Sequence, residues 1–212
     1  MNIDSIQNGV VLDHIQAGKS MDIYRYLHLD QLDCSVAIIK NVNGDAIIAV
    51  YPFTPQASIS QAVINVADVP VFVGVGGGYT NGSRSVRLAM QAEHQGAYGV
   101  VVNAPMPNEV IAEIKSVVDI PVIATVVSDR SDIKGRIEAG TDIFNVSGAA
   151  ETASIVRHIR EQYPHAAIIA TGPTEESILE TIRAGANAIT ITPPTTGELF
   201  AGIMHDYREK KL

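Results

Sequence analysis

Cysteine is almost absent from this chain of 212 residues: Cys34 is its only one. This scarcity excludes an internal disulfide and a zinc site built from several cysteines. Basic residues are also few, with 15 Lys and Arg against 23 Asp and Glu and a formal net charge of -8. That balance argues against a nucleic-acid-binding surface, which needs a basic footprint.

Long apolar runs and a basic-then-apolar N-terminal pattern are missing as well. We therefore expect a cytoplasmic protein without a membrane partner. His, Asp and Glu do not gather at several predicted strand ends, so no metal site is expected. No Gly-x-Gly-x-x-Gly motif opens a helix after the first predicted strand, and we expect no cofactor.

Apolar residues make up 46% of the sequence, enough for one large core, and only 18% are charged. Short apolar runs recur with helical stretches between them, which is typical of parallel strands covered on both faces. The final run, for example, follows Gly185 as Ala186-Asn187-Ala188-Ile189-Thr190-Ile191. The predicted strands cover residues 8–13, 45–51, 70–75, 98–103, 120–125, 141–146, 166–171 and 187–192.

Eight such strands in eight strand–helix steps predict an α/β fold, a (β/α)₈ TIM barrel in one domain of residues 1–212. An open doubly wound sheet is the alternative, and the regular repeat favours closure. Residues 34–40 are ambiguous, because an apolar run that short fits a strand or a short helix. Among the helix starts, we expect Thr174 to cap one helix and Ser128-Asp129 another.

Function in a barrel gathers at the C-terminal ends of the strands. The loops after the seventh and eighth strands each precede a predicted helix N-terminus, where backbone amides and the helix dipole favour an anion. We therefore predict a phosphate there, although caps and turns explain the same residue types. The predicted phosphate-binding residues are Gly172, Thr174, Thr196 and Gly197.

Hydroxyl, amide and glycine residues also end the other strands, and this composition suits a small polar ligand. The predicted substrate-binding residues are Tyr51, Gly76, Gly77 and Ser147. The weak candidates for catalysis are Asp13, His14, Asn103 and Asn145, of which Asp13-His14 is the only acid–base pair at a predicted strand end. Such a pair is structural at least as often as catalytic, so the residue that moves a proton is left unassigned.

Two stretches of the chain are specific enough to compare with known families: Asp45-Ala46-Ile47-Ile48-Ala49-Val50-Tyr51-Pro52-Phe53-Thr54-Pro55-Gln56 and Ala170-Thr171-Gly172-Pro173-Thr174-Glu175-Glu176. Through them, residues 43–212 resemble a family of bacterial barrel proteins that are labelled hydrolases without an established reaction. The arrangement is more distantly similar to phosphate-binding barrels that isomerise or cleave sugar phosphates. Those often have paired glycines after strand seven, whereas here Pro173 follows a single Gly172.

The N-terminal part of the chain contains two further stretches of this kind: Ile6-Gln7-Asn8-Gly9-Val10-Val11-Leu12-Asp13-His14-Ile15 and Leu32-Asp33-Cys34-Ser35-Val36-Ala37-Ile38-Ile39-Lys40-Asn41. Through them, residues 1–42 resemble a different family, the aspartate carbamoyltransferase regulatory chain. This resemblance implies a strand–helix–strand piece of a nucleotide-binding domain, with Asp13 and His14 as the nucleotide contacts. The phosphate-binding lysines and the four-cysteine zinc domain of that family have no counterpart here.

Together the two resemblances indicate a chimera, natural or engineered, joined near residues 41–44, or one uniform family with a familiar N-terminus. We expect a barrel that acts on a small phosphorylated metabolite as a hydrolase, isomerase or lyase. A non-catalytic or engineered scaffold is the alternative, and a nucleotide-binding regulatory module ranks last. Whether the chain is an enzyme, and whether it forms a homo-oligomer, stays open at this point.

Overall fold

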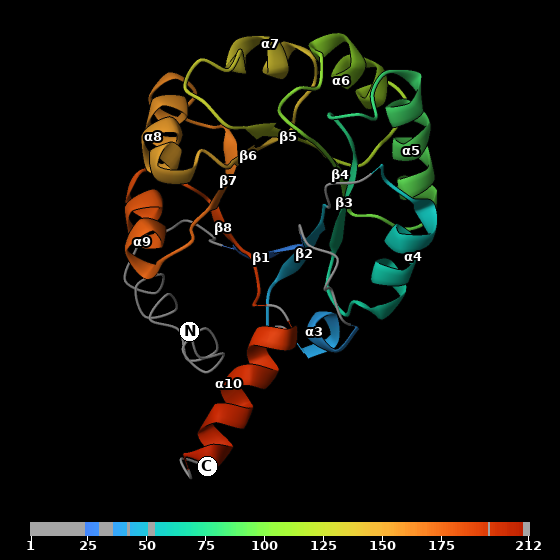
Figure 1. Ribbon diagram of the computed structural model, residues 1–212. Helices are drawn as coiled ribbons and strands as arrows, with labels where there is room; N and C mark the ends of the chain where they lie inside the picture. Colours follow the sequence, from blue (N-terminus) through green and yellow to red (C-terminus); the bar gives the residue numbers. More distant parts are fainter. Residues whose placement is uncertain (1–23, 30–35, 42, 51–53, 195, 210–212) are drawn as a thin grey trace.

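The fold is a closed barrel of eight parallel strands in chain order (Figure 1). It is seen in a computed structural model that describes residues 24–29, 36–41, 43–50, 54–194 and 196–209. The strands are β1 (Tyr24–Leu29), β2 (Ala46–Ala49), β3 (Val71–Gly76), β4 (Gly99–Val102), β5 (Val122–Val126), β6 (Ile143–Val146), β7 (Ala167–Thr171) and β8 (Ala188–Ile191). The predicted TIM barrel is confirmed.

Helices alternate with the strands and lie around the barrel, except that the last described helix projects away from it (Figure 1). They are α3 (Val36–Asn41), α4 (Ala57–Val66), α5 (Ser83–His94), α6 (Asn108–Lys115), α7 (Ile133–Glu138), α8 (Thr152–Gln162), α9 (Glu175–Arg183) and α10 (Thr196–Arg208), with a 3₁₀ turn at Ala149–Glu151 before α8. Thr174 caps α9 as predicted, with its hydroxyl accepting a hydrogen bond from the Ser177 amide. The predicted cap of α7 at Ser128-Asp129 is wrong, because Asp132 caps that helix and accepts from the Gly135 amide.

The first strand of the barrel is not where the sequence pattern placed it. β1 lies at residues 24–29 and pairs with both β2 and β8, so it fills the position predicted for residues 8–13. Residues 8–13 themselves lie outside the described part of the chain. Arg25 and His28 interrupt the apolar run of β1, so a search for strands that are apolar on both faces passes over it. The ambiguous stretch at 34–40 forms helix α3 from Val36 onward.

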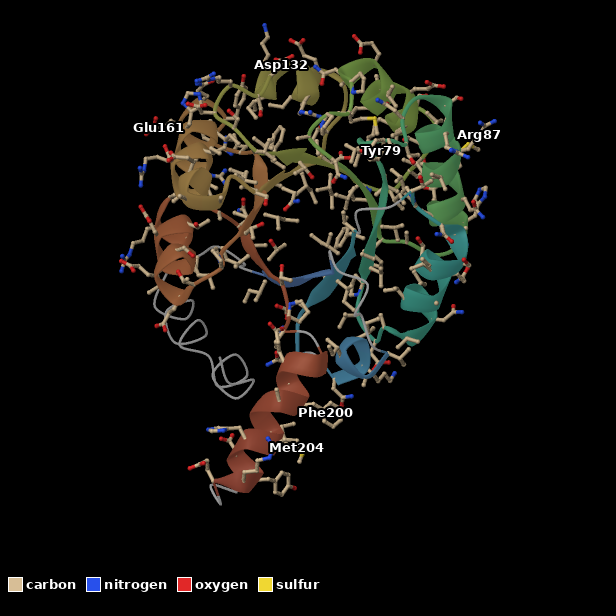
Figure 2. The ribbon with its side chains drawn as sticks, viewed as in Figure 1. Tyr79, Arg87, Asp132, Glu161, Phe200 and Met204 are labelled. Carbon is tan, nitrogen blue, oxygen red and sulfur yellow. The ribbon has the colours of Figure 1, made fainter. Side chains whose placement is uncertain are left out.

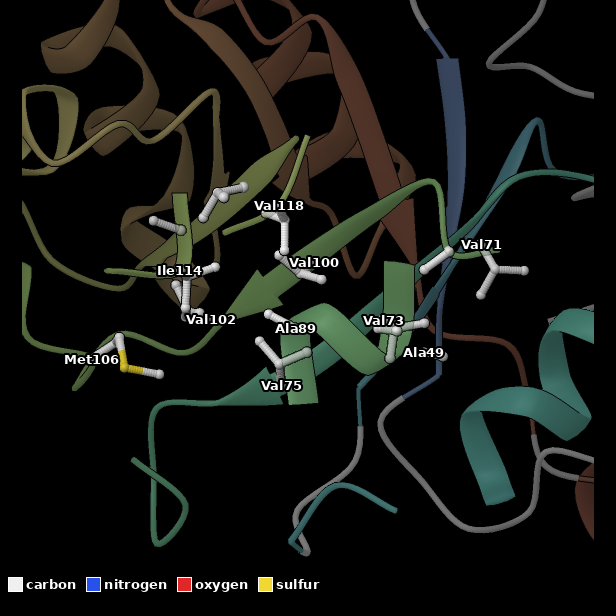
Figure 3. Packing of buried hydrophobic residues seen from close by; sticks show 14 of the residues in the cluster. Ala49, Val71, Val73, Val75, Ala89, Val100, Val102, Met106, Ile114 and Val118 are labelled. Atoms are coloured by element: carbon white, nitrogen blue, oxygen red, sulfur yellow. The ribbon is translucent and has the colours of Figure 1, made fainter. Parts of the chain in front are cut away.

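Two apolar layers hold the barrel together, because successive strand side chains point to opposite faces of the sheet. One set points outward beneath the helices, and Figure 3 shows part of it, where Val73 and Val75 of β3 pack with Ala89 of α5. The other set fills the barrel interior and is called the inner core here. It comprises Ala46, Ile48, Phe72, Val101, Ile123, Ile169 and Ala188, with Val50 and Ile143 packed against it.

Arg160 of α8 ties that helix to the turn before β8. Its Nε and Nη2 donate to the Gly185 carbonyl oxygen at 3.1 and 2.8 Å, Nη2 also donates to Asn187 Oδ1 at 2.7 Å, and Nη1 donates to the Pro164 carbonyl oxygen at 2.6 Å. Partial burial lowers the pKa of this guanidinium, but an arginine stays charged in proteins. The planar guanidinium group therefore donates hydrogen bonds to two backbone carbonyl groups and to one amide side chain.

Replacing Arg160 with methionine should lower the free energy of unfolding by about 2 kcal/mol, because two backbone acceptors lose their donors. Urea unfolding followed by circular dichroism measures this change. Arg160→Lys should recover little of this free energy, because one ammonium group cannot reproduce the hydrogen-bond geometry of the guanidinium. The matched control is Arg157→Met on the exposed side of the same helix, and an equal loss in that control would contradict the assignment.

Candidate functional site

A polar layer lies inside the barrel, directly above the inner core and toward the C-terminal ends of β5 to β8. It consists of Thr125, Asn145, Thr171 and Thr190, each two residues beyond an inner-core position on its own strand. A spacing of two residues places these side chains on the same inward face. Strand register aligns Thr125 with Asn145 and Thr171 with Thr190.

Hydrogen bonds join the members of the polar layer in pairs. Asn145 Nδ2 donates to Thr125 Oγ1 at 3.4 Å, and the hydroxyls of Thr171 and Thr190 lie 3.1 Å apart. Asn145 is 3% exposed, and its Oδ1 finds no donor among the described residues. A buried acceptor without a partner is costly, so this atom suits a hydrogen-bond donor supplied by a bound molecule.

The loop after β7 satisfies most of its polar groups internally. Gly172 is buried, and its amide donates to the Thr190 carbonyl oxygen at 3.3 Å. The Thr174 amide and hydroxyl are both engaged with Ser177 in a capping box. Glu175 and Glu176 occupy the first turn of α9, where they already complement the helix dipole. A phosphate at this loop would meet two nearby carboxylates.

The loop after β8 leads into α10, the longest helix among the described residues. Thr196 begins α10 and Gly197 is exposed in its first turn. The first amides of an α-helix have no partner within that helix, and they are the natural anion ligands at this edge of the barrel. The structure does not test the phosphate assignment to Gly172, Thr174, Thr196 and Gly197, which stays a prediction.

Gly76 and Gly77 lock the loops after β3 and β4 together. The Asn103 amide donates to the Gly76 carbonyl oxygen at 2.9 Å, and the Gly77 amide donates to the Thr80 carbonyl oxygen at 2.9 Å. Both glycines have positive φ, 142° and 106°. Gly77 has no space for a side chain, because a Cβ there would lie 2.6 Å from the Asn103 amide nitrogen. The structure thus supplies a packing reason for both glycines, and ligand binding by them stays a prediction.

Of the four remaining predicted site residues, the structure describes Ser147 alone. Ser147 follows β6 and is half-buried, with its amide donating to the Val126 carbonyl oxygen at 2.8 Å. Asp13, His14 and Tyr51 lie outside the described residues. The sequence analysis did not select Thr190, because this residue lies inside a predicted strand and the candidates were taken from the ends of the strands. Its spacing of two from Ala188 was the available signal.

Positive charge near the rim is held in Arg136 of α7. It is 7% exposed, and its Nη2 donates to the Ala104 carbonyl oxygen at 2.5 Å in the loop after β4. Burial lowers the pKa of this guanidinium, and the nearby Asp132 carboxylate partly offsets that effect.

Within the described ranges, no group of three or more His, Cys, Asp or Glu could hold a metal ion. The same ranges contain no helix long and apolar enough to cross a bilayer.

Comparison with known sequences finds two different likenesses. The family described as the aspartate carbamoyltransferase regulatory chain, allosteric domain, matches residues 1–49. The regulatory chain of Clostridium botulinum is 48% identical over 44 residues, 21% of this chain and 30% of that protein. A protein of Shouchella clausii named "Putative N-acetylmannosamine-6-phosphate 2-epimerase" is 31% identical over 123 residues, 50% of this chain and 53% of that protein. The chain thus spans about a third to a half of these relatives.

Comparison with solved structures supports the fold. A 2,3-dimethylmalate lyase of the PEP mutase/isocitrate lyase superfamily gives a TM-score of 0.65 at 14% identity, covering 94% of this chain and 86% of that one. An aldolase called QR15 gives a TM-score of 0.65 at 17% identity, covering 82% and 91%. The regulatory-chain match extends past the expected junction at 41–44 and includes β2. The chain is therefore a TIM barrel whose first two strands lie within a segment similar to the regulatory chain of aspartate carbamoyltransferase.

Proposed function

We propose that this chain is a cytoplasmic, phosphate-binding TIM-barrel enzyme that isomerises or epimerises a small sugar phosphate. The observation that carries the proposal is the polar layer, in which Asn145 Oδ1 is buried without a donor among the described residues, at the C-terminal end of the barrel. Active sites of TIM barrels are built at this end. The partial likeness to the Shouchella clausii protein supports the choice of sugar phosphates.

The chemistry of a sugar phosphate suits the two parts of the candidate site. Its hydroxyl or acylamino groups would donate to Asn145 Oδ1 and exchange hydrogen bonds with the neighbouring threonines of the polar layer. Its phosphate would lie between the predicted residues Gly172 and Thr174 after β7 and Thr196 and Gly197 after β8, nearest the open amides of α10. The acylamino or hydroxyl end then enters the barrel and the dianion stays at the rim.

A second candidate is a barrel that binds such a ligand without catalysis. Threonine and asparagine side chains do not ionise near neutral pH, and the polar layer contains no other residue type. General acid–base catalysis needs a titratable group within hydrogen-bond reach of the substrate. Asp13 and His14 are the titratable residues that the sequence analysis offers for this role.

Binding is tested first, with N-acetylmannosamine 6-phosphate, unphosphorylated N-acetylmannosamine and inorganic phosphate in a thermal-shift and calorimetric series. A ligand at a hundred times its dissociation constant should stabilise the protein by about 2.7 kcal/mol. Asn145→Leu should lower the affinity for the sugar phosphate about tenfold, which corresponds to the loss of one hydrogen bond. The affinity for inorganic phosphate should not change. Equal affinity in wild type and Asn145→Leu would contradict the use of the polar layer.

The phosphate assignment has its own matched pair of variants. Gly197→Glu places a carboxylate in the first turn of α10, where it favours the helix and repels an anion. Gly202→Glu adds the same charge to an exposed position of the same helix with nothing within 4 Å. Loss of phosphate affinity in the first variant alone supports the assignment, and unchanged affinity in both would refute it.

Catalysis is tested by incubation of the bound sugar phosphate in heavy water. Epimerisation next to a carbonyl breaks a carbon–hydrogen bond, so deuterium should appear at that carbon in the NMR spectrum. Binding without deuterium incorporation would favour the non-catalytic barrel over the enzyme.

A further inference from the structure

Strand β1 carries a histidine near its C-terminal end. The strand register pairs His28 with Ile48 of β2, which belongs to the inner core. It also pairs Tyr26 with Ala46, another inner-core residue. Paired residues of neighbouring parallel strands occupy the same face of the sheet, and the face alternates along each strand. Positions 26 and 28 of β1 therefore belong to the inward face of the barrel.

Position 28 is also level with the polar layer. Thr171 of β7 pairs with Thr190 of β8, and Thr190 pairs with Tyr26 of β1. The strands of a TIM barrel are tilted with a shear of eight over eight strands, so the level advances by about one residue from each strand to the next. Two strands beyond Thr171, the level position is therefore two residues past Tyr26, and that residue is His28.

The same counting places two members of the polar layer at this level. Thr125 of β5 pairs with Asn145 of β6, and Asn145 pairs with Ile169 of β7. Two residues past Ile169 is Thr171, so Thr125 and Thr171 are level with each other. The interior of a TIM barrel is built in layers to which alternate strands contribute. His28 on β1 takes its place in one such layer with Thr125 on β5 and Thr171 on β7.

Histidine differs from the other inward residues because an imidazole gains and loses a proton near neutral pH. The inner core and the polar layer consist of apolar residues, threonine and asparagine. Charged side chains such as Arg87 and Glu161 lie on the outer surface of the helices (Figure 2). Among the inward positions of the described strands, position 28 is therefore the one suited to general acid–base catalysis near neutral pH.

We propose that His28 is the acid–base residue of this barrel, an inference that rests on the proposed function. The neutral imidazole takes the proton from the carbon next to the substrate carbonyl. The electron pair of the broken carbon–hydrogen bond forms the double bond of an enolate, and the carbonyl oxygen takes the negative charge. Water protonates the opposite face of that carbon, which restores the carbonyl and gives the epimer. The imidazolium then returns its proton to the hydroxide that is left.

Deuterium incorporation from heavy water into N-acetylmannosamine 6-phosphate tests the proton transfer. His28→Gln should lower the rate of incorporation about a hundredfold or more and leave the calorimetric affinity for the sugar phosphate largely unchanged. The matched control is His158→Gln, which removes an exposed histidine of α8 and should change neither value. Incorporation by His28→Gln at the wild-type rate would overturn the proposal, and so would a wild type that binds the sugar phosphate without incorporating deuterium.

A measurement without ligand tests the placement of His28 separately. Thr171→Val replaces the hydroxyl of a residue in the same layer with a methyl group of similar size. In carbon-13 NMR spectra of the labelled full chain, it should move the ring resonances of His28 and leave those of the exposed His158 and His205 in place. Unmoved His28 resonances would overturn the placement. A wild type that binds no sugar phosphate would instead overturn the proposed function and the proton transfer with it, so the two failures are distinguishable.

Discussion

Gly77→Ala should lower the free energy of unfolding by about 3 kcal/mol, a large effect for the addition of one methyl group. Backbone strain from the positive φ of 106° contributes part of it. The rest comes from contact, because the new Cβ would lie 2.6, 2.7 and 2.9 Å from the amide nitrogen, the carbonyl oxygen and the Cα of Asn103. These are backbone atoms, so no side chain can rotate away to relieve the overlap.

The neighbouring glycine supplies the control for this experiment. Gly78 is exposed, has nothing within 4 Å of the position that a Cβ would occupy, and has no positive φ. Gly78→Ala should therefore stay within about 0.5 kcal/mol of the wild type in chemical denaturation. Equal stability of the two variants would show that the β3 and β4 loops do not interlock as described.

Ile123→Ala should lower the free energy of unfolding by about 4 kcal/mol, because it removes a side chain from the middle of the inner core. Ile123 lies on β5, is 0% exposed and points into the barrel with Phe72, Val101 and Ile169. Strands that close on themselves cannot easily move inward, so the deleted atoms leave a cavity in addition to the lost burial energy. The loss should appear in the midpoint of denaturant unfolding with little change in its slope.

Ile137→Ala on α7 is the comparison for the inner-core substitution. Ile137 is 39% exposed, and its truncation should cost less than about 1 kcal/mol. If both substitutions cost the same, the barrel interior would not be the tightly packed layer that the strand register indicates.

The sequence pattern was most informative where a strand is covered on both faces. Seven predicted strands, from 45–51 to 187–192, agree with β2 to β8 to within two residues at each end. Most side chains of β2 to β8 are apolar on both faces, and only uncharged polar residues such as Asn145 and Thr190 fall within them. β1 differs, since Arg25 and His28 fall within it. Its place is set by pairing with β2 and β8, and long-range pairing leaves no local mark in the sequence.

The candidate site was less predictable than the fold. Asn145 was chosen because it ends a strand, but the chain alone does not show that its amide reaches Thr125 across the sheet. The sequence suggests that Gly76 and Gly77 bind a ligand, but in the structure a Cβ on Gly76 would meet Thr80 and Ser85, and one on Gly77 would meet Asn103 of the next loop. Distinguishing a glycine that leaves room for a ligand from one that leaves room for the chain itself requires the three-dimensional arrangement.

The pairing of β1 with β8 has a consequence for synthesis of the protein. These two strands close the barrel, yet about 160 residues separate Leu29 from Ala188 along the chain. A ribosome adding 5–20 residues per second needs roughly 8 to 32 s to make that length. During this interval the first strand has β2 on one side and no final neighbour on the other, so the nascent chain must keep an unpaired sheet edge from aggregating until the last strand emerges.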